Sequence, residues 1–269
     1  MIEDVGQTPK HATLALNADA VIAPALRAMR LSSEMMSIGL SALETADLSN
    51  PPPLTAGFFA LGFEGEEDPV AKKAQYTAWL LAKGFQELAK GLRATLEEAY
   101  VFVKVPQLIQ GPMTLGELQA GMAGIQRKAN KLNFPDLTAA VQEDLQGPMN
   151  FVEEFTSLNR ARNCLEHRHG IVGQTDLDAG QQVMRLRIPR LKVMIQQQGE
   201  AEEELIAPLH VQKESIVSVT QASRERQFVL GETISFDAAQ FQEVAMGCWF
   251  LANDIGTKLP KPAQAAATS

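Results

Sequence analysis

Apolar residues recur every three or four positions along most of this chain, but in one stretch they alternate with polar residues. A period near 3.6 is typical of amphipathic helices, and a period of two is typical of strands with one buried face. Helical spacing dominates residues 19–170 and 237–259, and alternation begins at 183. We therefore predict a mainly α-helical bundle with a small antiparallel β insertion before its last helix.

Chain breakers divide the helical part into five or six helices. Three prolines follow Asn50, and Gly-Pro pairs stand at 111–112 and 147–148, where the backbone cannot continue a helix. Thr114 followed three residues later by Glu117 has the form of a capping box and predicts a helix start. The predicted helices cover residues 19–48, 69–105, 114–132, a short segment after 135, a segment from 151 to Gly170 or Gly173, and 237–259. Their predicted apolar stripes are Ile22, Leu26, Met29, Met36, Leu40 and Leu43 in the first helix, Leu81, Phe85, Leu88, Leu92, Leu96 and Ala99 in the second, and Phe241, Val244, Cys248, Leu251, Ile255 and Leu259 in the last.

The β insertion is predicted over residues 181–236. Met184, Leu186 and Ile188 alternate with arginines, and two further β-rich segments, 216–219 and 228–236, complete the sheet. Pro189 lacks a backbone N–H and predicts a position at a sheet edge. The whole chain, 1–269, is expected to form one domain, with a disordered tail at 261–269.

Composition limits which partners and which cellular compartment we expect for the protein. The net charge of −8 argues against a protein that coats nucleic acid by bulk attraction, yet residues 160–192 hold seven basic and three acidic residues. The longest apolar run, 56–63, is far shorter than the roughly 20 residues that a membrane span needs. With two cysteines and no leader-like N-terminal pattern, we expect a cytoplasmic protein without membrane contact or disulfides.

Polar residues are dense at the end of the helix predicted over 151–170. Two of the four histidines and three arginines lie within ten residues of one another, from Arg160 to His169. Helical geometry places Arg162 inside the apolar stripe, where a charge needs a partner. Arg162 is therefore either one half of an intrahelical ion pair with Glu166 or a residue held at an interface for use.

The motif Arg162-Asn163-x3-His167, with Gly170 three residues later, resembles the signature of the HEPN superfamily. The resemblance covers the motif helix and, more loosely, the helices around it. It implies a HEPN-like helical fold and a metal-independent endoribonuclease, in many members a toxin or defence protein with a cognate antitoxin. Other members are non-catalytic modules that bind RNA or protein. The resemblance also implies a homodimer in which two motifs face a shared cleft.

The motif residues suit RNA cleavage without a metal ion. Such cleavage needs a base for the 2′-OH proton, an acid for the leaving 5′-oxygen and a cation for the phosphorane. Histidine titrates near neutral pH, so His167 is suited to act as the acid or the base. The guanidinium of Arg162 is suited to bind the phosphate, and Asn163 to orient His167 or the scissile group. On a straight helix Arg162 and His167 point about 140° apart, so either the helix ends there or a partner chain completes the site. His169 is an intramolecular alternative for the second proton.

Further RNA contacts are predicted for basic residues around the motif and on the first strand of the insertion. They are Arg160, Arg168, His169, Arg185 and Arg187. No metal or cofactor is expected, because the spacing of His167 and His169 does not place both on one helix face, and no phosphate-binding glycine loop or nucleophile elbow occurs. Cys164 is expected to be a buried apolar group. A helical scaffold in which the motif is a coincidence stays open as a third interpretation.

Overall fold

The computed structural model describes residues 15–49, 54–57, 59–61, 68–109, 111–197, 199, 201–205 and 214–261. The elements in these ranges are α1 (Ala18–Thr45), β1 (Leu54–Ala56), β2 (Phe59–Leu61), α2 (Pro69–Leu108), α3 (Leu115–Lys131), α4 (Phe134–Gln142), α5 (Val152–His167), a short 3-10 turn (Gln174–Asp176), β3 (Val183–Gln197), β4 (Glu203–Glu204), β5 (Ser215–Val229) and α6 (Ala238–Lys258). The predicted fold class, helices with an antiparallel sheet before the last helix, is confirmed. The tail after Lys261 lies outside the described residues.

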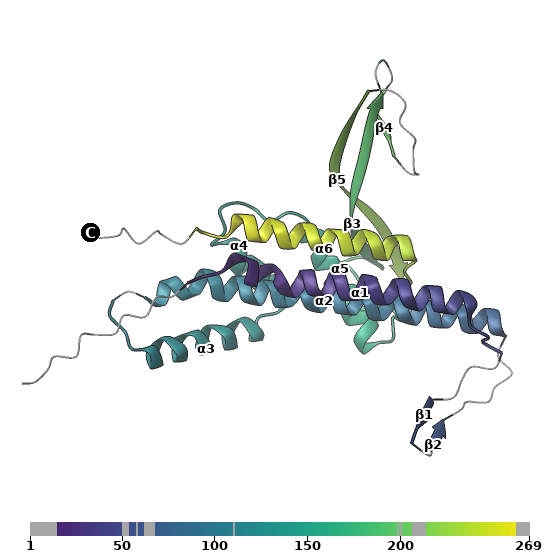
Figure 1. Ribbon diagram of the computed structural model, residues 1–269, viewed down its shortest axis with the longest axis horizontal. Helices are drawn as coiled ribbons and strands as arrows, with labels where there is room; N and C mark the ends of the chain where they lie inside the picture. The colour runs from purple at the N-terminus through teal and green to yellow at the C-terminus, as the bar shows by residue number, and fades with distance from the viewer. Residues whose placement is uncertain are drawn as a thin grey trace, which may run out of the picture.

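Two long helices, α1 and α2, lie side by side, and α6 runs along them (Figure 1). The predicted apolar stripes of α2 and α6 are buried in one core: Leu81, Phe85, Leu88, Leu92, Leu96 and Ala99 from α2, and Phe241, Val244, Cys248, Leu251, Ile255 and Leu259 at α6. The start of α3 is also as predicted, with Thr114 and Glu117 forming the capping box. No helix in the described ranges is long and apolar enough to cross a membrane.

The predicted face of α1 is only partly buried. Met36 is the one residue of the predicted stripe that is fully buried, and Met29 and Leu40 are partly buried against the core. The other fully buried residues of α1 are Val21, Ala25 and Ser32. The reason is that α1 contacts α2 on one side and α6 on another, so its burial is divided between two directions. Met29, Met36 and Leu40 accordingly line a pocket together with Phe241 and Ala245 of α6.

At Gly91 the helices α1 and α2 approach closely, and alanine there is expected to destabilise the protein. A Cβ atom at Gly91 would lie 2.3 Å from the Cβ of Ala28 and 3.0 Å from the carbonyl oxygen of Pro24. We expect Gly91→Ala to lower the free energy of unfolding in urea by about 1–3 kcal/mol. Gly124→Ala in α3 is the matched control: a Cβ there meets nothing within 4 Å, so it should stabilise by about 0.5–1 kcal/mol. Equal effects of the two substitutions would contradict this packing.

The sheet has the strand order β4-β3-β5, and β3 and β5 pair over 15 residues each. Figure 1 shows that much of this hairpin stands away from the helices. The prediction of two separate strands at 216–219 and 228–236 is wrong: β5 continues through polar residues 220–227 and ends at Val229. The backbone ladder with β3 holds those polar residues in a strand without an apolar face, and residues 230–236 form the turn that leads to α6.

Pro189 occupies the local edge that the sequence predicts. It faces Ser223 of β5 on one side, while β4 pairs only with Met194 and Ile195, farther along β3. On its other side Pro189 packs against α6 at Gly247, where a Cβ atom would lie 2.4 Å from the proline Cγ. The N–H of Arg187, two residues earlier in the same register, points away from β5 and donates to Ser157 Oγ, so the missing N–H of Pro189 costs no ladder hydrogen bond with β5.

Candidate functional site

The motif helix, α5, is fixed at both ends. At its start, the backbone N–H and the side-chain amide of Asn150 donate to the carboxylate of Asp254 in α6, both at 2.9 Å. At its end, the N–H of Gly170 donates to the carbonyl oxygen of Cys164 at 3.1 Å, and His169 takes a positive φ of 54°. The helix ends at His167, so the last motif residue lies at a helix terminus.

Arg162 forms the ion pair that the sequence leaves as one of two alternatives. Its Nη2 lies 2.5 Å from Oε2 of Glu166, and its Nη1 donates to Oδ1 of Asn163 at 3.0 Å. The side chain is 25% exposed, so the guanidinium is near the surface but held by two neighbours. Two of the three motif residues are thus joined directly.

His167 is the exposed member of the motif. Its side chain is 63% exposed, and its Nε2 lies 4.0 Å from the same Glu166 oxygen that binds Arg162. Arg162 and His167, which point apart on the helix, therefore lie on two sides of one carboxylate. Arg162 and His167 thus approach the same Glu166 oxygen, Asn163 accepts a hydrogen bond from Arg162, and the imidazole is open to solvent.

Arg168, assigned above to RNA, has a structural partner. Its Nε donates to Oδ2 of Asp176 at 2.8 Å, and its Nη2 pairs with the other oxygen of that carboxylate. Asp176 is buried, and it also accepts the N–H of Gly173 at 2.8 Å. The hydrogen bonds with Asp176 raise the pKa of Arg168. This cluster closes the loop that follows α5.

The two cysteines are buried and are expected to make stability fall at high pH. Burial raises the pKa of Cys164 to about 11 and that of Cys248 to about 12. Above pH 9 the unfolded chain loses thiol protons that the folded chain keeps, so the free energy of unfolding should fall as the pH rises from 9 to 11. Urea unfolding at pH 8 and pH 10.5 measures this fall. Cys248→Ala should show a smaller fall, and an equal one would contradict the assignment.

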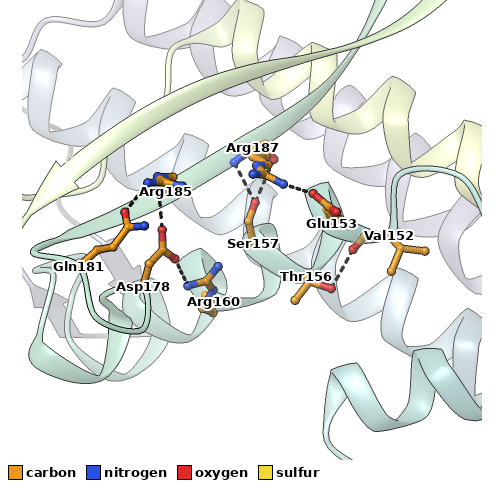
Figure 2. Close-up of a pocket in the computed structure, with 9 residues that line it drawn as sticks. All are labelled: Val152, Glu153, Thr156, Ser157, Arg160, Asp178, Gln181, Arg185 and Arg187. Atoms are coloured by element: carbon orange, nitrogen blue, oxygen red, sulfur yellow. Dashed lines mark hydrogen bonds and ion pairs between the residues drawn. The ribbon is translucent and has the colours of Figure 1, made fainter.

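A cavity of about 340 Å³ lies between α5 and β3. Figure 2 shows its polar lining, with Arg160, Arg185 and Arg187 directed toward Asp178 and Glu153. Arg160 Nη1 lies 2.5 Å from Oδ1 of Asp178, and Arg185 Nε lies 3.7 Å from the other oxygen of that carboxylate. Three residues assigned above to RNA are thus brought together here, apart from the motif cluster.

The basic residues of β3 meet acidic residues that the sequence does not place beside them. Arg187 pairs with Glu153 of α5 and lies 3.6 Å from Glu225 of β5, and Arg190 pairs with Glu204 and lies 3.3 Å from Glu243. The strand is therefore largely charge-compensated. RNA phosphates would have to compete with these carboxylates, and an RNA contact of the strand stays a prediction.

The sequence does not predict the carboxylates that meet Arg168 or those that line the cavity between α5 and β3. In the sequence Asp176 and Asp178 are two of the three acidic residues within 160–192, and Glu153 receives no role. Their spacing from the arginines follows no helix or strand period, because loops and a strand return bring them together. The one available signal is Glu166, four residues after Arg162.

Within the described part of the chain, no group of three or more His, Cys, Asp or Glu side chains is arranged to hold a metal ion. A scan against known protein families, a search of curated proteins and a search of solved structures each found no match. The resemblance to the HEPN superfamily therefore rests on the motif residues themselves.

Proposed function

We propose that the protein is a HEPN-like endoribonuclease that cleaves RNA without a metal ion, at a cleft built by two copies of the chain. The observation that carries the proposal is the exposed imidazole of His167 at the end of α5, beside the linked side chains of Glu166, Arg162 and Asn163. A titratable group open to solvent and next to a guanidinium is what phosphodiester cleavage by proton transfer needs.

The reaction requires two proton transfers. A base takes the proton of the 2′-OH, the 2′-oxygen bonds to phosphorus, the bond from phosphorus to the 5′-oxygen breaks, and an acid protonates that oxygen. The products are a 2′,3′-cyclic phosphate and a 5′-OH. His167 of one copy serves as base and His167 of the other as acid, while Arg162 stabilises the charge on the phosphate.

An exposed apolar patch beside the motif supports a two-copy cleft. Ile171, Val229 and Leu230 are 51%, 55% and 48% exposed. They lie in two backbone segments that hydrogen bonds join directly after the motif helix, since the N–H of Gly231 donates to the carbonyl oxygen of Val172. We expect Ile171→Glu to break this contact, to halve the mass of the assembly in sedimentation equilibrium and to abolish cleavage, because a charge would enter the interface. Undiminished cleavage by an Ile171→Glu protein of half the wild-type mass would contradict the shared cleft.

RNA modified at the ribose tests the proposed chemistry. We expect the wild-type protein to cleave an RNA in EDTA and to leave intact the same RNA with a 2′-O-methyl group at the cleavage position, because the nucleophile is blocked. Cleavage of the methylated bond would contradict 2′-OH attack.

A non-catalytic RNA-binding or protein-interaction module is the second candidate function. The ion pair of Arg162 with Glu166 favours it, because that carboxylate occupies part of the guanidinium that would bind phosphate. In this case RNA and its methylated form would be bound equally and neither would be cleaved. A role as a toxin with a cognate antitoxin belongs to the first candidate: growth arrest on expression of the wild type, absent with His167→Ala, would support it.

A further inference from the structure

The outer edge of β5 is a long strand edge that no other strand in the described part of the chain covers. The sheet order is β4-β3-β5, so β3 pairs with only one side of β5. Figure 1 shows the distal half of the hairpin standing clear of the helices, with β4 on the side of β3. A strand edge of this length offers a row of backbone donors and acceptors to another strand.

The distal half of this edge lacks the features by which folded proteins keep strand edges apart. Residues 216–223 contain neither a charged residue nor a proline. Ile216, Val217 and Val219 are 69%, 60% and 57% exposed, so both faces of the distal half carry open apolar side chains. Charges and prolines are the usual protection of an edge, and their absence here indicates an edge that pairs.

The sequence of β5 favours a second copy of itself as the pairing strand. If two β5 strands run antiparallel about a two-fold axis through Val219, Ser218 faces Thr220 and the two Val219 side chains face each other. In the same register Glu214 of each copy faces Arg224 of the other, which places opposite charges at both ends. Glu214 has no ion-pair partner among the described residues, and Arg224, paired with Glu243 at 2.8 Å, is still 45% exposed.

We propose that β5 pairs with β5 of a second copy in this register, and that the two sheets join into one. The contact is isologous, with the same residues contributed by each copy. It is separate from the patch beside the motif helix and does not depend on the proposed ribonuclease activity.

Charge reversal tests the proposal on the full-length protein by sedimentation equilibrium. We expect Glu214→Arg to weaken self-association about tenfold, because each copy then sets arginine against arginine. Adding Arg224→Glu should restore association, since the charges are again opposite. Glu203→Arg in β4, at the opposite edge of the sheet, is the matched control and should leave association unchanged. A monomeric wild type, or association that Glu214→Arg does not weaken, would overturn the proposal. If Glu214→Arg does not weaken association, the copies associate through another surface, such as the patch beside the motif helix.

Cross-linking tests the register. The two native cysteines are buried, so a short bis-maleimide reports on an introduced one. In Val219→Cys the two sulfur-bearing side chains lie about 5 Å apart across the axis, and the reagent should join two chains. In Ser223→Cys the equivalent positions are about 26 Å apart, and no joining is expected. Equal cross-linking at both positions, or none at 219, would overturn this pairing.

Discussion

Asp176→Ala is expected to lower the free energy of unfolding by about 3–5 kcal/mol. The side chain of Asp176 is only 3% exposed, and it accepts hydrogen bonds from both Arg168 and the N–H of Gly173. Alanine leaves the guanidinium and the N–H without their acceptor in a partly buried place. Because these bonds close the loop after α5, the motif end of the helix should also lose order.

Urea denaturation measures this loss, and an exposed ion pair supplies the control. Arg30 and Glu34 in α1 are 79% and 56% exposed, so Glu34→Ala should change the free energy of unfolding by less than about 1 kcal/mol. The double variant Arg168→Met/Asp176→Leu should recover much of the stability, since it removes both charges together. If Asp176→Ala costs no more than Glu34→Ala, the buried pair does not hold the loop.

His167→Ala is expected to reduce the rate of RNA cleavage by about 10² to 10⁴-fold. His167 is exposed, and among the described residues its one ion-pair neighbour is Glu166, at 4.0 Å, so the free energy of unfolding of the variant should be within about 0.5 kcal/mol of that of the wild type. Single-turnover cleavage of a labelled RNA measures the rate, and a urea curve confirms the fold. The loss can then be assigned to chemistry rather than to stability.

His169→Asn is the matched control for this prediction. His169 lies two residues from His167, is exposed, and takes a positive φ that asparagine tolerates. If proton transfer is shared by His167 of two copies, His169→Asn keeps most of the activity. An equal loss from both variants would instead indicate that two histidines of one chain share the work.

The elements that sequence predicts well are those with a strong local signal. The capping residues Thr114 and Glu117 are neighbours on the helix they start, and the stripe from Leu81 to Ala99 repeats over five turns. The strand β5 was predicted as two pieces because its middle is polar, and its pairing with β3 is a long-range property. The predicted face of α1 is only partly buried, because two different helices pack on that helix.

In the candidate site, too, contacts between residues close in sequence could be predicted and contacts between distant residues could not. The Arg162 and Glu166 pair is four residues apart and could be predicted as an alternative, as could the burial of Cys164. The carboxylates that meet Arg168 and Arg187 come from a loop and from other elements, so no periodicity predicts them. Whether an arginine in a basic stretch is available to RNA therefore depends on the fold, not on the spacing.

The chemical ends of the cleaved RNA distinguish 2′-OH attack at the motif from other routes of cleavage. Purified wild-type protein is incubated with end-labelled RNA in EDTA, beside folded His167→Ala and Arg162→Ala proteins. We expect cleavage by the wild type alone, with 2′,3′-cyclic phosphate and 5′-OH ends. Cleavage that persists in both variants, or wild-type products that carry 5′-phosphate ends, would contradict it.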